Sequence, residues 1–115
     1  MKVLLINKRA TPEQMNAMLQ SLESYIKLAV DIERGILAGG GTLHSDCEEA
    51  LLENGSEQKN IWGADWLPFH QAVTFESLIN IRPRQNNLSL EVQDRELRIT
   101  IERIVRNLME GVDYE

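Results

Sequence analysis

The residues best equipped for chemistry fall into two polar stretches, 27–49 and 80–87. The first stretch holds the only cysteine, one of the two histidines and a cluster of carboxylates. Within it, Asp31 and Glu33 lie two positions apart, and His44 is followed by Asp46. A histidine beside carboxylates is the residue set of acid–base catalysis. The candidate catalytic residues are therefore His44, Glu33 and Asp46.

The second stretch, NIRPRQNN, places Arg82 and Arg84 on either side of Pro83. If the chain is extended there, the two guanidinium groups project on one side and can grip a carboxylate or phosphate. We expect them to face Asp31 and Glu33, either as an ion-pair network within one chain or across two subunits, or by sharing an anion. The candidate binding residues are Asp31, Arg82, Arg84, Gln85, Asn87 and Trp62.

A structural interpretation of the same residues remains open. Asp46 and Glu49 are favourable near the positive end of a helix dipole. The spacing of His44, Asp46 and Glu49 is not a specific metal signature, so no metal site is assigned and any cofactor is unknown. The three glycines 39–41 match the spacing of neither common phosphate-binding loop.

Hydrophobic periodicity predicts the elements that must position these residues. Alternating apolar positions are typical of a half-buried strand, and a repeat of three and four residues is typical of a helix. Each expected helix starts at a residue that can cap its free N–H groups, with capping boxes at Thr11/Gln14 and Ser45/Glu48. The expected strands cover 3–6, 25–32, 36–38, 61–67 and 73–81, and the expected helices begin after Thr11, Ser45 and Asp94.

This order, β-α-β-β-α-β-β-α, predicts an α+β fold: a small, mostly antiparallel mixed sheet with about three helices covering one face. Its 115 residues suit a single domain, 1–115. The apolar runs are too short for a membrane helix or a signal peptide, so we expect a cytoplasmic protein. The net charge of −6 disfavours nucleic acid as a partner.

Four segments together resemble a known family: DIERGILAGGG, LHSDCEEALLENGS, WGADW and SLINIRPRQNN. The family consists of small bacterial proteins and is catalogued only as a domain of unknown function. The resemblance covers most of the chain from about residue 31 to 87. It implies a cytoplasmic bacterial protein and implies no activity, cofactor or catalytic residue.

The sequence predicts a small soluble binding or regulatory module that acts as a homo-oligomer. A dimer is the simplest form, because open sheet edges and strand tryptophans such as Trp62 need covering. A small anionic ligand is a further expected partner. The alternative is an enzyme whose polar cleft, acid–base or metal-assisted, contains Glu33, His44 and Asp46 together with Arg82 and Arg84.

Overall fold

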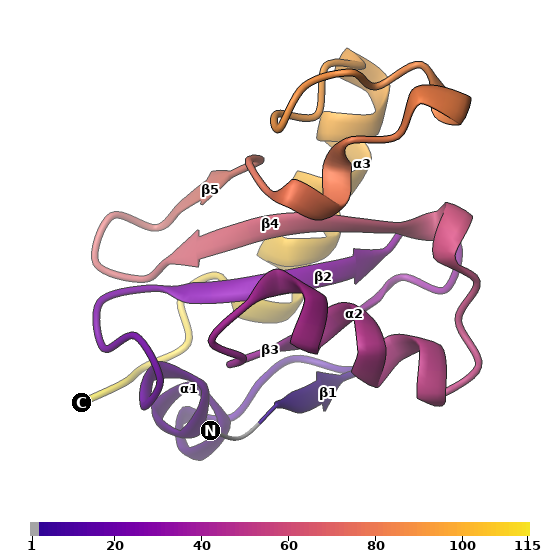
Figure 1. Ribbon diagram of the computed structural model, residues 1–115. Helices are drawn as coiled ribbons and strands as arrows, with labels where there is room; N and C mark the ends of the chain where they lie inside the picture. Colours follow the sequence, from indigo (N-terminus) through magenta and orange to yellow (C-terminus); the bar gives the residue numbers. More distant parts are fainter. Residues whose placement is uncertain (1–2) are drawn as a thin grey trace.

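A five-stranded sheet organises the computed structural model, which describes residues 3–115 (Figure 1). The strands lie in the order β1-β3-β2-β4-β5, and every neighbouring pair is antiparallel. Their bounds are Leu4–Ile6 (β1), Ile26–Asp31 (β2), Ile36–Gly39 (β3), Ile61–Leu67 (β4) and Ala72–Thr74 (β5). The predicted α+β class and element order are confirmed.

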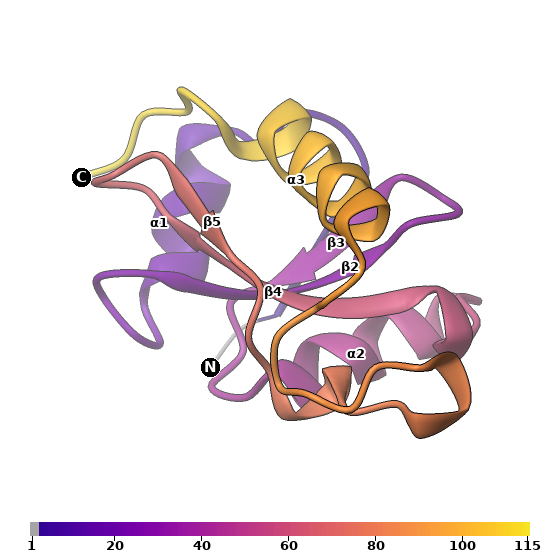
Figure 2. The same cartoon turned by 90° about the horizontal axis from the view of Figure 1, so that it is seen from above.

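The helices cover both faces of the sheet, where the sequence predicted one (Figure 2). The apolar side chains of Leu28 and Val30 in β2 pack toward α1 (Pro12–Leu19) and α3 (Arg95–Met109). Ala29, between them in sequence, packs on the opposite face against α2 (His44–Glu53). Strands with apolar residues at consecutive positions are buried on both sides. On the face that carries α2, the small side chains of Ala29 and Ala38 let the helix approach closely.

The helix starts follow the capping chemistry of the sequence in two cases out of three. The capping box of Thr11 and Gln14 at α1 and the Asp94 cap of α3 are confirmed. The Ser45 cap predicted for α2 is wrong, because the helix already begins at His44. Asp46 provides the side-chain contact instead, since its Oδ2 accepts a hydrogen bond from the Leu43 N–H at 3.1 Å.

The predicted long strand 73–81 is wrong as well. Strand β5 ends at Thr74, and the chain then crosses the face that carries α2 as a 3-10 turn, Leu78–Asn80. Close packing at Gly63 of β4 makes this crossing possible, because a Cβ there would lie 2.5 Å from the Cβ of Ser77. Asn80 takes the place of a strand neighbour: its side chain binds both the N–H and the C=O of Gly63, at 2.8 and 3.0 Å.

Residues 75–92, called here the 75–92 segment, lie beside β4 and α2 (Figures 1 and 2). The segment contains a second 3-10 turn, Pro83–Gln85, and its two ends pair through a bridge between Glu76 and Glu91. Within the described range 3–115, no helix has the length and apolar character needed to cross a membrane. The crease between α2 and the 75–92 segment holds the candidate sites.

Candidate functional site

Arg82 is the most fully bonded polar side chain at this crease. Its side chain is 10% exposed, and the guanidinium carbon lies 4.8 Å from the centre of the Trp62 ring. A guanidinium has five N–H groups. Five acceptors meet them: the carbonyl oxygens of Gln58, Ile61 and Ile79, and side-chain oxygens of Glu48 and Gln85. Burial lowers the pKa of Arg82, and the charge of Glu48 opposes that shift.

The predicted pairing of Arg82 and Arg84 with Asp31 and Glu33 is wrong as a network within one chain, and a pairing across two subunits stays a prediction. Pro83 starts a 3-10 turn rather than continuing an extended chain, so Arg82 points inward while Arg84 is exposed. Asp31 is fully buried and organises the turn after β2, where its Oδ1 accepts from the N–H groups of Glu33 and Arg34 at 2.9 and 3.0 Å. Glu33 is exposed on that turn.

The other predicted binding residues hold the 75–92 segment together. Asn87 is 3% exposed, and its amide nitrogen donates to the carbonyl oxygens of Asn80, Ser89 and Glu91. The Gln85 amide donates to the Lys59 carbonyl at 3.0 Å. Trp62, with Trp66, lies in the core toward α1 and α3, so it presents no exposed aromatic patch. These polar groups therefore support the loop and each other.

His44 has a different setting, at the first turn of α2. Its Nε2 lies 2.8 Å from Oδ1 of Asp65 and 3.1 Å from the Ala64 carbonyl oxygen. Both partners are acceptors, so Nε2 carries the hydrogen and Nδ1 is the remaining nitrogen of the ring. The second oxygen of Asp65 accepts from the Thr74 hydroxyl at 2.8 Å. The strand pair β4–β5 thereby fixes the orientation of the imidazole ring.

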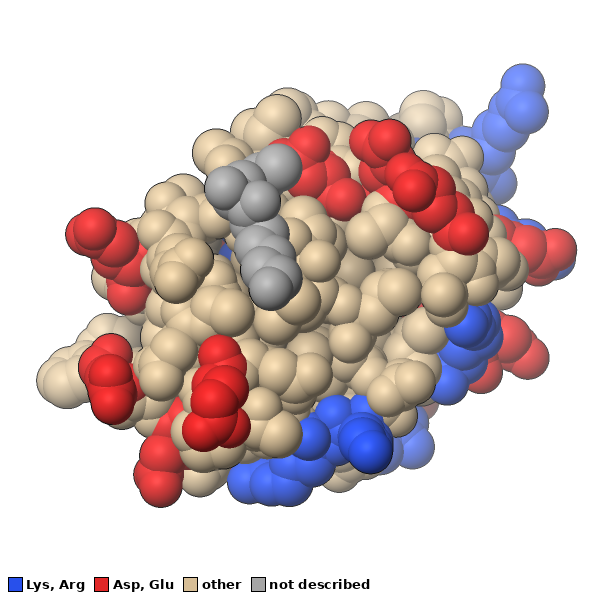
Figure 3. Space-filling view, turned by 90° about the horizontal axis from the view of Figure 1, so that it is seen from below, with Lys and Arg blue, Asp and Glu red and all other residues tan. Residues whose placement is uncertain are grey.

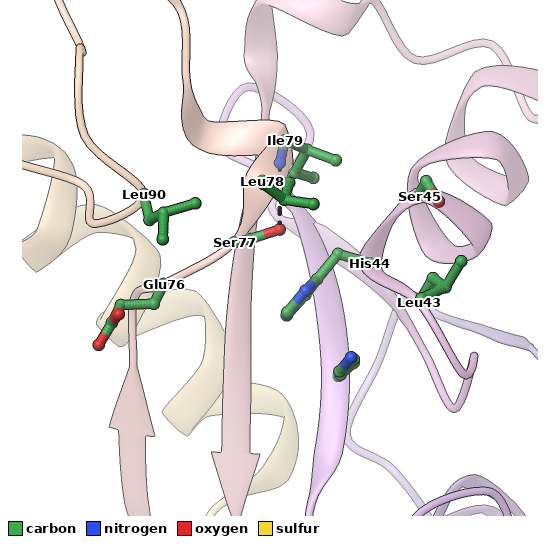
Figure 4. Close-up of a pocket in the computed structure, with 9 residues that line it drawn as sticks. Leu43, His44, Ser45, Glu76, Ser77, Leu78, Ile79 and Leu90 are labelled. Carbon is green, nitrogen blue, oxygen red and sulfur yellow. Dashed lines mark hydrogen bonds between the residues drawn. The ribbon is translucent and has the colours of Figure 1, made fainter.

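A pocket of about 410 Å³ opens beside this pair, within the size range of small-molecule sites (Figure 4). Its apolar walls are formed by Leu43, just before α2, and by leucine and isoleucine side chains of the 75–92 segment. The Ser77 hydroxyl and the His44 ring lie toward its centre, whereas the Glu76 carboxylate turns away from both (Figure 4). The residues that line the pocket are Lys27, Leu43, His44, Ser45, Glu76, Ser77, Leu78, Ile79 and Leu90.

Lys27 is the cation of this pocket, and sequence reasoning did not select it. It is half-buried and stands opposite Asp65 in the β2–β4 register. Among the residues that the structure describes, its ammonium group has no hydrogen bond or ion pair. A signal was present in the sequence, since Lys27 and Asp65 are charged residues within two largely apolar strands.

Cys47 lies close to the pocket but is not equipped to act as a nucleophile. Its side chain is fully buried, and burial raises the pKa of the thiol to about 11. The charges of Asp46 and Asp65 add to this rise, whereas the Gly41 backbone and Lys27 oppose it. A thiol that is protonated at neutral pH is a poor nucleophile. Cys47 is a small core residue beneath α2.

A second hollow, of about 580 Å³, lies at the Arg82 end of the crease. It shares Leu78 and Ile79 with the first pocket, but its polar side chains Arg82, Gln85 and Glu48 already bind each other. Arg84 reaches it from the exposed side. The other lining residues are Gln58, Ile81 and Pro83.

The structure does not unite the predicted catalytic set in one cleft. Arg82 binds β4 at Ile61 and His44 binds it at Asp65, which are separated by roughly 13 Å of strand. Glu33 follows the far end of β2 and lines neither pocket. Asp46 caps its own helix. No three His, Cys, Asp or Glu residues within the described chain lie close enough to hold a metal ion.

The fold and the pocket define a small α+β domain with a ligand-sized site between one helix and an irregular segment. The chain belongs to the family described as Protein of unknown function (DUF5674), whose model matches residues 4–108. The family predicted from the sequence segments is thereby confirmed. Comparisons with the curated proteins and with the solved structures gave no match.

Proposed function

We propose that the protein is a binding module that takes up a small molecule in the pocket beside His44. The observation that carries this proposal is a pocket of about 410 Å³ whose polar end is held rigid by the His44–Asp65 hydrogen bond. Its walls are aliphatic, and pockets of this kind bury the apolar body of a ligand while a few fixed polar groups orient it. The ligand therefore has an apolar body of modest size.

The apolar wall can be tested with two leucines of the same loop. Leu90 lines the pocket and is 42% exposed, whereas Leu88 is 73% exposed and does not line it. With 3-phenylpropanamide as an uncharged probe, Leu90→Ala should weaken binding about fivefold, since a partly buried leucine contact contributes roughly 1 kcal/mol. Leu88→Ala should leave the affinity unchanged. Ligand-observed NMR that detects no binding by the unsubstituted protein would contradict the proposal.

Acid–base catalysis is a second candidate, favoured by the buried carboxylate that orients His44. A histidine whose Nε2–H is held by Asp65 keeps its other nitrogen for exchanging a proton with a ligand. The two functions differ in the fate of the bound molecule. A bound compound that is recovered unchanged after long incubation, followed by one-dimensional NMR, supports binding alone, and turnover that is lost in His44→Gln supports an enzyme.

We further propose that the module acts as a homo-oligomer, most simply a dimer, in the bacterial cytoplasm. Strand β1 has a hydrogen-bonded neighbour on one side only, and Leu5 within it is 38% exposed. The face in Figure 3, seen from the side where β1 and α1 lie, has a broad uncharged area with charged side chains toward its margins. Light scattering that finds only monomer at high micromolar concentration would contradict this part of the proposal.

A further inference from the structure

Lys27 is the one lysine or arginine among the residues that line the first pocket. Its ammonium group has no ion-pair partner within residues 3–115, although the side chain is half-buried. An ammonium group has three N–H donors and no acceptor, so a ligand that displaces water from it must supply acceptor atoms. The apolar walls do not determine the charge of the ligand, whereas the Lys27 ammonium group favours a ligand with a negative charge.

The charges around Lys27 limit the ligand to a single negative charge. Asp65 stands opposite Lys27 on the same face of the sheet, and its two oxygens are occupied by His44 and Thr74. Glu76 lines the pocket but turns its carboxylate outward (Figure 4). The charge of Asp65 beside Lys27 repels a doubly charged phosphate more strongly than a singly charged carboxylate. A monocarboxylate matches the one available cation.

The start of α2 favours an anion at the same end of the pocket. Helix α2 begins at His44, and Leu43, His44 and Ser45 line the pocket. The N-terminal end of a helix carries partial positive charge. The Asp46 carboxylate at the cap offsets part of this field, and what remains adds to the field of Lys27 at the same end of the pocket.

From these contacts we infer that the ligand is an apolar monocarboxylic acid. Its carboxylate binds Lys27 near the start of α2, and its hydrocarbon body lies against Leu78, Ile79 and Leu90. This inference rests on the proposed binding function of the same pocket and adds the charge of the ligand. It also moves the predicted anion-binding role from Arg82 to Lys27, because Arg82 has no free donor.

Calorimetric titration of the full chain with three matched probes tests the inference. The probes are 3-phenylpropanoate, the uncharged 3-phenylpropanamide and 2-phenylethyl phosphate, which share a phenylethyl group and differ in their polar group. A charge-assisted hydrogen bond is roughly twice as strong as a neutral one. We expect the carboxylate to bind at least tenfold more tightly than the amide and more tightly than the phosphate.

Variants then assign this preference to one residue. Lys27→Met should lower the carboxylate affinity to about that of the amide, whereas Lys59→Met, at an exposed lysine outside the pocket, should retain the preference. The melting temperature of each variant shows that it is folded. Equal affinity for carboxylate and amide, or a preference that survives Lys27→Met, would overturn the inference and leave the binding function standing. Absence of binding by all three probes would overturn both.

Discussion

The two ends of the crease between α2 and the 75–92 segment use their polar residues in opposite ways. At one end, all five N–H groups of Arg82 have protein acceptors. At the other end, Lys27 has no partner among residues 3–115, and His44 keeps one ring nitrogen beyond its bonds to Asp65 and Ala64. A polar residue whose hydrogen-bonding capacity is used within the protein supports the fold, whereas spare capacity in a pocket is available to a ligand.

The contrast is sharpest for Arg82, which should be the most costly side chain to remove. Arg82→Met leaves Glu48 without its guanidinium partner and frees three carbonyl oxygens in a crowded crease. Breaking a buried ion pair from one side costs about 3–5 kcal/mol. Urea unfolding should show a loss of that size. Arg84→Met is the matched control and should stay within about 0.5 kcal/mol of the unsubstituted protein; similar losses in both variants would contradict the contrast.

Asn80 also stabilises the Arg82 end of the crease, because its side chain bonds to the backbone of β4. Asn80→Ala removes the side chain that bonds the N–H and C=O of Gly63 in β4. Two buried backbone groups then lack partners, and we expect a loss of about 2–3 kcal/mol in the free energy of unfolding. Asn107→Ala, at an exposed position of α3, should change it by less than about 0.5 kcal/mol. Equal effects would show that the Asn80 bonds contribute little.

Cys47 tests whether the core beneath the pocket excludes water. Its pKa is raised from 9.0 to about 11, so between these pH values the unfolded chain loses a proton that the folded chain keeps. The free energy of unfolding should therefore fall with rising pH, by about 2 kcal/mol at pH 11 from this thiol alone. Cys47→Ala should show a correspondingly shallower fall between pH 9 and 11. Identical slopes in the two proteins would indicate a thiol exposed to solvent.

Replacing Lys27 should have the smallest effect on stability. This is expected at the open end of the crease, the end at Lys27 and His44, where polar groups are not used within the protein. Lys27→Met removes a charge that has no ion-pair partner within the described chain, and it keeps the side-chain length. We expect the free energy of unfolding to change by less than about 0.5 kcal/mol. Urea unfolding that instead shows a loss comparable to Arg82→Met would mean that Lys27 is a structural residue, and the contrast between the two ends would fail.

The sequence predicted the fold well where hydrophobic period and capping chemistry acted together. Helix α3 illustrates this, because its apolar stripe and the Asp94 cap agree. The strand expected over 73–81 failed, because alternation does not reveal that Gly63 admits the Ser77 side chain or that Asn80 replaces a strand neighbour. Those contacts join residues that are 14 and 17 positions apart, beyond the reach of a local pattern.

The site was predicted only in part, for a related reason. His44 was selected by residue type and lines the pocket, but its partner Asp65 is 21 positions away, inside the expected strand 61–67. Arg82 was selected by its charge, although its role depends on acceptors contributed by α2, β4 and neighbouring turns. Residue type indicates which groups can do chemistry, and only tertiary contacts show which of them are already satisfied.

The most direct test of the central contrast is to locate bound 3-phenylpropanoate by two-dimensional amide NMR. Binding at the Lys27 end predicts the largest shift changes at residues 43–45, at the start of α2, and little change at Arg82, Arg84 and Gln85. Leu78 and Ile79 line both hollows, so their amides do not discriminate between the two ends. Shift changes centred on residues 82–85, with residues 43–45 unaffected, would place the ligand at the Arg82 end and contradict the account.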